Sequence, residues 1–355
     1  MGIDISKVDK NFAQPAFDVK DGMKYYPIPC APFELYGVFH DGEGFVRMPR
    51  EVASEVSEGV AILNAHTAGG RLRFTTDSEY MELVVRFDLS LMRHMALSGS
   101  AGFSLLRENE DGSCAFAAGF YPVPGQDLNG FTCRLRIGNG KDMQHYVLHF
   151  PLYNNVYSLT VGLDEGATVK PGLPYRDELP ILYYGSSITQ GGCASRPDNA
   201  YQAYISKWTN TDFINLGFSG NAKAEDRMAE YLENIQCSIF VYDYDHNAPN
   251  AEHLEKTHER FFLHFRKHHP NVPVVMVSKP DFDMYPAADA KRRAVIKKTY
   301  RNAKKNGDEN VYFVDGQKLF GKEDRENCYV DGCHPTDLGF YRMAKEIYKV
   351  IKKLI

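Results

Sequence analysis

The second half of the chain alternates short apolar runs with longer amphipathic segments, and this alternation restricts the possible folds more than any other feature. Five runs have the length of a buried strand, and each is followed by a segment of helical length. The runs are 181–184, 213–216, 239–244, 274–277 and 311–314, and the helical segments are 200–208, 224–235, 251–268, 287–305 and 335–353. Parallel strands joined by right-handed crossover helices produce this pattern. The sequence therefore predicts an α/β/α three-layer sandwich around a five-stranded parallel sheet.

In the first half of the chain, the pattern of apolar and polar residues has a shorter period. From about residue 17 to 165, apolar and polar residues alternate in brief runs that are separated by turn-forming pairs such as Asp111-Gly112. Many short alternating strands predict antiparallel sheets that pack on one face, in a jelly-roll-like β-sandwich. A weak helical segment at 49–58 and a long aromatic loop at 108–126 interrupt the pattern. The aromatic side chains of that loop either fill the core or offer a face to a sugar ring.

A segment with three prolines and two glycines, 166–180, separates the two halves. A length of 355 residues also fits two domains. We therefore expect a β-sandwich domain at 1–170 and an α/β domain at 171–355. The sandwich would serve as an accessory, carbohydrate-binding-like domain.

Charge and composition narrow the classes of partner. The net charge of -5 gives no electrostatic reason to expect nucleic acid or an anionic membrane. No stretch reaches the ~18 apolar residues of a membrane helix, and residues 1–20 lack the apolar centre of a signal peptide. Seven cysteines without regular spacing suit reduced thiols. We expect a cytoplasmic protein with neither nucleic acid nor membrane as partner.

Polar residues follow all five predicted parallel strands. The clusters lie at 185–189, 217–221, 243–247, 279–283 and 331–335. The carboxyl ends of parallel strands share one edge of the sheet, and ligands bind beyond that edge. The five clusters therefore predict one functional site. Within it, we expect Lys279, Asp281 and Asp283 to contact substrate.

The residues at this edge can support nucleophilic ester hydrolysis. Ser187 follows a buried strand directly, so its hydroxyl can project from the edge, although a serine in this position can also cap a helix. His334 can take the serine proton because imidazole titrates near neutral pH. Asp331 precedes His334 by three residues, so one tight turn can place its carboxylate on the imidazole. The sequence predicts a Ser187–His334–Asp331 triad.

Hydrogen-bond donors for an oxyanion are also present. The backbone N–H groups of Ser187 and Gly220 and the side-chain amide of Asn247 can together form an oxyanion hole. Glycine at position 220 lets the backbone approach a substrate closely. No cofactor is needed for this chemistry. No metal site is predicted, because Cys328, Cys333 and His334 lack a fourth ligand at zinc spacing.

Four ordered blocks resemble those of the SGNH, or GDSL-type, hydrolases. They are Gly-Ser-Ser-Ile-Thr at 185–189, Asn-Leu-Gly-Phe-Ser-Gly-Asn at 215–221, the asparagine after the third strand and Asp-x-x-His at 331–334. The resemblance covers about residues 181–355 and implies a flavodoxin-like SGNH fold with Ser187 as nucleophile. Two positions depart from the family pattern. Ser186 replaces the usual Asp, and Asp245-His246-Asn247-Ala248 replaces Gly-x-Asn-Asp.

The first half resembles the β-sandwich that precedes the catalytic domain in some bacterial carbohydrate esterases. Among these enzymes, it is similar to two-domain acetylesterases acting on plant mannan or xylan oligosaccharides. This resemblance implies a serine esterase that removes acetyl groups from acetylated oligosaccharides through an acyl-enzyme intermediate. The alternatives are a lipid or thioester acylhydrolase on the same fold, or a non-catalytic sugar-binding protein.

Overall fold

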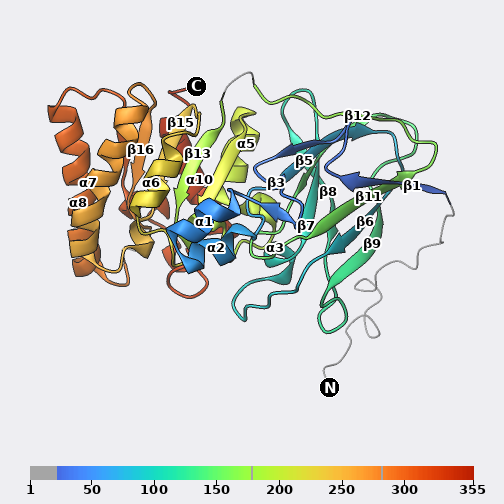
Figure 1. The fold of residues 1–355 in the computed structure, drawn as a ribbon, viewed down its shortest axis with the longest axis horizontal. Helices are drawn as coiled ribbons and strands as arrows, with labels where there is room; N and C mark the ends of the chain where they lie inside the picture. The colour runs from blue at the N-terminus through green and yellow to red at the C-terminus, as the bar shows by residue number, and fades with distance from the viewer. Residues whose placement is uncertain (1–21, 177–178, 281–282) are drawn as a thin grey trace.

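The computed structural model describes residues 22–176, 179–280 and 283–355, which form two domains lying side by side along the long axis of the molecule (Figure 1). The predicted two-domain fold, antiparallel sheets followed by a parallel α/β sheet, is confirmed. Among these residues, no helix combines the length and the apolar character that a membrane span needs.

The N-terminal domain consists mainly of two antiparallel sheets. One sheet has the order β1-β11-β6-β9, and the other has the order β12-β5-β10-β7-β8 with β2 also paired to β5. The strands are β1 Met23–Ile28, β2 Glu34–Tyr36, β3 Phe39–His40, β4 Phe45–Val46, β5 Arg71–Thr76, β6 Tyr80–Arg86, β7 Phe103–Glu108, β8 Cys114–Phe120, β9 Gly130–Arg136, β10 Gln144–His149, β11 Ser158–Asp164 and β12 Val169–Pro171. Alternate residues of the two sheets, such as Leu83 on β6 and Leu148 on β10, meet in one apolar core.

The C-terminal domain contains the predicted parallel sheet, with the strand order β14-β13-β15-β16-β17. Its strands are β13 Ile181–Gly185, β14 Phe213–Gly217, β15 Ile239–Asp243, β16 Val274–Val277 and β17 Val311–Val314. Every pairing in this sheet is parallel. All five strands are largely apolar because both faces of the sheet are covered.

Helices cover both faces of this sheet. The α-helices are α4 Ser187–Gln190, α5 Tyr201–Thr209, α6 Asp226–Leu232, α7 Ala251–His268, α8 Pro286–Lys305, α9 Gly316–Leu319 and α10 Asp337–Ile351, and short 3₁₀ turns lie at Pro197–Asn199, Asp245–Asn247 and Arg325–Cys328. Leu182 and Tyr184 of β13 pack with α6, α7 and α8, whereas Ile181 and Tyr183 pack with α5 and α10. The side-chain alternation of one strand therefore supplies both apolar layers.

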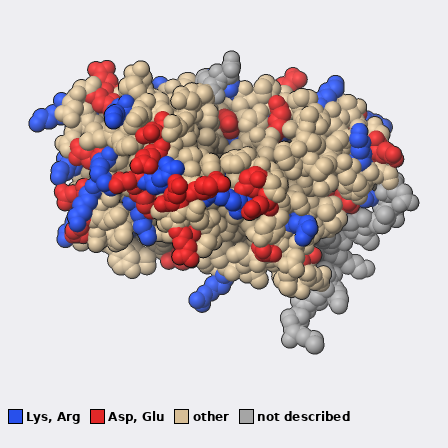
Figure 2. All heavy atoms as spheres, in the orientation of Figure 1, with Lys and Arg blue, Asp and Glu red and all other residues tan. Residues whose placement is uncertain are grey.

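Acidic and basic side chains are mixed on the face of the molecule that carries α6, α7 and α8 (Figure 2). Several of them pair across the helices. Lys298 of α8 lies 3.0 Å from Glu255 of α7, and Arg260 of α7 lies 2.8 Å from Asp226 of α6. The lysine-rich helix α8 is therefore an ordinary solvated outer face with charge partners on its neighbour.

Two details of the first half differ from the expectation. The segment 108–126 is not one long loop, because β8 folds back on β7 as a hairpin closed by the Asp111-Gly112 turn. Its aromatic residues differ in burial. Phe120 is buried in the sandwich core, whereas Phe116 is exposed, and the Arg196 guanidinium lies 4.5 Å from the centre of the Phe116 ring.

The polar face of β5 is also not exposed to solvent. Arg71 and Arg73 are fully buried, because this face packs against the C-terminal domain.

The weak helical segment near residue 50 forms two short helices, α1 Arg50–Val56 and α2 Glu58–Asn64. Ser57 begins α2 by accepting a hydrogen bond from the Val60 N–H. Although both helices belong to the first half of the sequence, α1 packs on α2 and α6, and the two helices place Ala53 and Val60 in the apolar core of the C-terminal domain. The linker at 166–180 therefore does not separate the two apolar cores, because two helices that precede it contribute to the core of the C-terminal domain.

Arg47 joins the two domains. Its side chain is buried, and its Nη1 donates to the carbonyls of Asn215 and Gly217 at 3.1 and 2.6 Å, at the end of β14. Its Nη2 donates to the carbonyl of Leu63 at 2.6 Å. Burial lowers the pKa of Arg47 to about 9, which leaves it cationic at neutral pH. Backbone carbonyl groups therefore solvate a buried cation at the junction.

We expect Arg47→Met to lower the apparent free energy of unfolding by about 2–4 kcal/mol, because it leaves three carbonyl groups without their donor. Urea denaturation would measure the loss. Arg50→Met is the matched control, since Arg50 is exposed and pairs with Asp41 at 2.5 Å on the surface. That variant should lose less than about 1 kcal/mol. Equal losses in the two variants would contradict the assigned role of Arg47.

Candidate active site

Ser187 lies where β13 ends and the short helix α4 begins. Ser186, not Ser187, caps this helix, because its side chain accepts a hydrogen bond from the Ile188 N–H at 3.1 Å. Ser187 is therefore the first helical residue, whose N–H has no partner within a helix. Gly191 ends α4 with a φ of 104°, which a residue with a side chain rarely adopts. One strand and one helical turn fix the position of the Ser187 hydroxyl.

The structure brings His334 and Asp331 to this hydroxyl. The His334 Nε2 lies 2.9 Å from the Ser187 Oγ, and the His334 Nδ1 lies 2.8 Å from the Asp331 Oδ2. The backbone N–H of His334 also donates to the Asp331 Oδ1, at 2.8 Å. Gly332 permits this tight turn with a φ of 78°. The three side chains form a continuous hydrogen-bonded chain.

Asp331 is held in its charged form. Burial alone would raise the pKa of its carboxyl group. Hydrogen bonds from the His334 backbone and ring, the charge of His334 and the Cys333 N–H together lower that pKa to about 2. At neutral pH the carboxylate therefore orients the ring and can stabilise an imidazolium.

The three N–H groups predicted to bind an oxyanion are free to donate in the described residues or are oriented by a neighbour. Within the described parts of the chain, neither the Ser187 N–H nor the Gly220 N–H has a hydrogen-bond acceptor. The Asn247 Oδ1 accepts from the Ala222 N–H at 3.2 Å. This bond fixes the amide so that its NH₂ group is the remaining donor. Gly220 has a φ of 71°, and no atom lies within 4 Å of where a Cβ would stand.

The N-terminal domain supports this site through residues that the sequence did not single out. The Tyr153 hydroxyl donates to the Ser187 carbonyl at 3.0 Å. The Gln190 Oε1 accepts from the Ser219 N–H, and its Nε2 donates to the Leu152 carbonyl. Gly59 of α2 lies so close to Asn221 that a Cβ would stand 2.1 Å from the Asn221 Oδ1. The two domains together fix the loop 217–221 between the nucleophile and α2.

Asp243 and Asp245 do not form a metal-binding pair. The Asp243 carboxylate accepts hydrogen bonds from Thr189 and Tyr201. Burial raises its pKa to about 7, against the opposing effect of those bonds. Asp245 instead pairs with Arg292 at 2.8 Å and accepts from the Lys279 N–H. Both carboxylates therefore have structural partners.

The three residues predicted to contact substrate have separate positions. The Lys279 Nζ lies 2.8 Å from the buried Asp289 carboxylate, and Asp283 lies 2.5 Å from Arg325. Asp281 lies outside the described residues. Both described side chains are thus already ion-paired, and their role in substrate binding stays a prediction.

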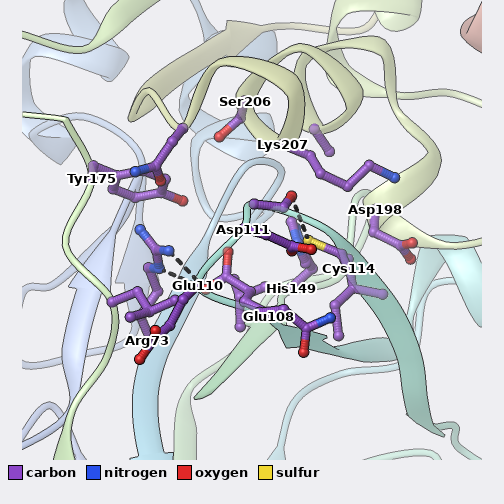
Figure 3. Close-up of a pocket in the computed structure, with 17 residues that line it drawn as sticks. Arg73, Glu108, Glu110, Asp111, Cys114, His149, Tyr175, Asp198, Ser206 and Lys207 are labelled. Carbon is purple, nitrogen blue, oxygen red and sulfur yellow. Dashed lines mark hydrogen bonds and ion pairs between the residues drawn. The ribbon is translucent and has the colours of Figure 1, made fainter. Parts of the chain in front are cut away.

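A cavity of about 270 Å³ lies at the junction of the domains, between the β7–β8 hairpin and α5 (Figure 3). No residue of the Ser187–His334–Asp331 chain lines it. Two of its charged groups pair with each other: the Arg73 Nε and Nη2 lie 3.0 and 2.7 Å from the Glu108 Oε2. The Tyr175 ring lies 4.1 Å from the same guanidinium. This cavity is separate from the candidate active site.

Comparisons with known proteins identify both halves. Residues 178–352 match the GDSL-like lipase/acylhydrolase family, and residues 23–169 match the N-terminus of SGNH-hydrolase-type esterases. No curated protein sequence matches the chain. A Bacteroides ovatus protein described as a GDSL-like lipase is 28% identical, with a TM-score of 0.83 over 94% of this chain and 98% of that chain.

Two further structures share the whole fold at lower identity. A salicylyl-acyltransferase from a tetracycline biosynthetic pathway is 20% identical, with a TM-score of 0.76 over 94% of this chain and 97% of that chain. An acetyl xylan esterase from the rumen bacterium Butyrivibrio proteoclasticus is 14% identical, with a TM-score of 0.61 over 94% and 98%. The chain is therefore an esterase or acylhydrolase whose residues 178–352 belong to the GDSL-like lipase/acylhydrolase family and whose residues 23–169 form the N-terminal domain of SGNH-hydrolase-type esterases.

Proposed function

We propose that the protein is a serine esterase that removes acetyl groups from acetylated oligosaccharides of the plant mannan or xylan type. Residues 171–355 form its catalytic domain, and residues 1–170 form an accessory domain. The observation that carries the proposal is the hydrogen-bonded chain from Ser187 through His334 to Asp331.

In the first half-reaction, the Ser187 oxygen attacks the ester carbonyl while the His334 Nε2 takes the hydroxyl proton. The carbonyl oxygen becomes an oxyanion and accepts hydrogen bonds from the Ser187 N–H, the Gly220 N–H and the Asn247 amide. His334 then returns the proton to the departing sugar oxygen, which leaves an acetyl-enzyme. Water, deprotonated by His334, attacks the acetyl carbonyl and releases acetate and the Ser187 hydroxyl.

The surroundings of Ser187 support a small acyl group. A Cβ added at Gly192 would stand 3.0 Å from both the His334 ring and the Tyr153 hydroxyl. The space beside the nucleophile is therefore narrow on this side. Gly220, in contrast, faces open space, which suits a bulky alcohol such as a sugar. The acetyl xylan esterase with the same two-domain fold supports the choice of substrate class.

We expect Ser187→Ala to reduce kcat by about 10⁴–10⁶, with the residual rate arising from binding and the oxyanion donors. Ester hydrolysis by the purified variant would measure the loss. Ser219→Ala is the control, because Ser219 sits in a Gly-Phe-Ser-Gly sequence that imitates a nucleophile motif. It should keep most of the rate.

Labelling by an organophosphonate separates an enzyme from a non-catalytic sugar-binding protein. Mass spectrometry should find the label on Ser187 in the wild-type protein and none in Ser187→Ala. A wild-type protein that takes up no label would exclude the acyl-enzyme mechanism.

We expect Asn247→Asp to reduce kcat by at least about 10²–10³. The substitution keeps an oxygen for the Ala222 N–H but replaces the amide donors with negative charge facing the oxyanion. Steady-state kinetics would give kcat, and urea denaturation would check that stability is preserved. An unchanged kcat would remove Asn247 from the oxyanion hole.

We expect aryl acetate to be hydrolysed faster than butyrate and octanoate, because the space beside Ser187 is narrow. The ratio of kcat/KM across the three esters measures this preference. Faster hydrolysis of octanoate would favour a lipid-directed acylhydrolase instead.

Acetylated xylo- and manno-oligosaccharides test the alcohol half of the proposal. Mass spectrometry before and after incubation should show loss of acetyl groups from the wild-type reaction and none with Ser187→Ala. If the protein hydrolyses aryl acetate but removes no acetyl group from the oligosaccharides, the sugar substrate is refuted and the esterase activity stands.

A further inference from the structure

Three potential metal ligands from distant parts of the chain meet beside Ser187. One ligand atom each from His94, Cys193 and His334 lies within 4.8 Å of the other two. His94 belongs to the turn between β6 and α3 (Leu97–Ser100) of the N-terminal domain, and Cys193 follows α4. The rings of His94 and His334 have centroids 5.5 Å apart. The Cys193 thiol donates to the His94 carbonyl at 3.4 Å.

The backbone holds this cluster in place. Cys193 has a φ of 73°, a conformation that costs a residue with a side chain free energy and persists only where the surroundings enforce it. The neighbouring Ala194 N–H donates to the Gly191 carbonyl, and Ser195 is bound by Asp337 at the start of α10. The segment between α4 and α5 therefore presents the thiol at a fixed position beside the two rings.

Two imidazoles and one thiolate are a ligand set that Zn²⁺ favours. In tetrahedral coordination at about 2.0–2.3 Å, ligand atoms lie about 3.3–3.8 Å apart. The ligand atoms, within 4.8 Å of one another, exceed that spacing by at most about 1–1.5 Å, which side-chain rotations can supply. The Asp331 carboxylate, 2.8 Å from the His334 ring, adds negative charge beside the cluster and favours a cation.

We propose that His94, Cys193 and His334 form an inhibitory binding site for a thiophilic divalent cation such as Zn²⁺. The fourth position is open to water or to the Ser187 oxygen. On binding, the Cys193 thiol releases its proton to solvent and forms a metal–sulfur bond, with no change in oxidation state. The inhibitory effect rests on the proposed function, because it requires His334 to act as the base.

Both nitrogens of the His334 ring are already engaged, one with Asp331 and one with Ser187. A cation on Nε2 removes the acceptor of the serine proton, and a cation on Nδ1 displaces the orienting carboxylate. Coordination through either nitrogen therefore abolishes the proton transfer. Mg²⁺ and Ca²⁺ prefer oxygen ligands and should not inhibit.

The chain offers two controls. Cys333 is adjacent to His334 in sequence, but its thiol lies 3.7 Å from the His246 Nδ1. A second cluster, Glu233, His264 and His268, also has ligand atoms within 4.8 Å of one another and lies on α7 and the end of α6. Cys333→Ser and His264→Ala therefore test a nearby thiol and a remote cation site.

The first measurement is a Co²⁺ titration of the full chain, with Co²⁺ as a spectroscopic substitute for Zn²⁺. The wild-type protein should develop a thiolate-to-cobalt charge-transfer band. Cys193→Ser should lose this band, and His94→Ala should need at least about tenfold more Co²⁺ to develop it. Cys333→Ser and His264→Ala should keep the band.

The second measurement is Zn²⁺ inhibition of aryl acetate hydrolysis, scaled to the metal-free rate of each variant. The concentration for half-inhibition should rise at least about tenfold in His94→Ala and Cys193→Ser, and stay at the wild-type value in both controls. EDTA should restore the rate. Inhibition that persists in His94→Ala and Cys193→Ser, or that disappears in His264→Ala, would overturn the site.

The two measurements separate this inference from the proposed function. A cobalt–thiolate band that depends on Cys193, in a protein that hydrolyses no ester, supports the site and refutes the esterase. Ester hydrolysis that Zn²⁺ leaves unchanged, in a protein without the band, refutes the site and leaves the esterase intact.

Discussion

The arrangement of the two domains depends on buried guanidinium groups at their junction. Arg47 is solvated by carbonyl groups of β14 and α2, and Arg71 pairs with Asp212 while lying 3.7 Å from the Phe213 ring. A buried cation without such partners would cost several kcal/mol, so each arginine is stable only with the C-terminal domain in place. The β-sandwich is therefore not an appended module. It covers a surface of the C-terminal domain that this domain does not cover by itself.

This dependence extends to the candidate active site. Arg47 binds the carbonyl of Gly217, three residues before Gly220, and Tyr153 binds the carbonyl of Ser187. Both side chains come from the first half of the sequence, yet they fix the backbone that carries two of the three proposed oxyanion donors. Preorganised donors stabilise developing charge best because they need not reorient during the reaction. The N-terminal domain thus contributes rigidity to chemistry that takes place on the other domain.

The parallel sheet could be predicted closely from the sequence, because strands buried on both faces appear as continuous apolar runs. All five strands and helix α7, at Ala251–His268, lie within about one residue of their predicted bounds. Strand-end loops then bring Ser187, Gly220, Asn247, Asp331 and His334 together, as the shared edge of a parallel sheet requires. Their catalytic roles stay predictions, although the hydrogen-bond geometry suits them.

The remaining features depend on how the domains dock, which no periodicity encodes. Arg71 and Arg73 occupy the polar positions of an alternating strand, which normally face water. Arg71 is instead buried against Asp212 and Phe213 of the other domain, and Arg73 is buried against Glu108 and Tyr175. His94 and Cys193 are separated by 99 residues, so no short metal-binding motif could reveal their contact. The helix α2 was missed because it is short, and its stability derives from packing on α1 and in the apolar core of the C-terminal domain rather than from its own propensity.

The distance along the chain between Ser187 and His334, 147 residues, has a consequence for synthesis of the protein. At about 5–20 residues per second, roughly 7–30 s pass between the emergence of Ser187 from the ribosome and that of His334. During this interval the sandwich, Arg47 and the serine turn can associate, but proton transfer from the hydroxyl has no acceptor. With His334 as the proposed base, hydrolytic capacity would therefore arise only with the last βα unit.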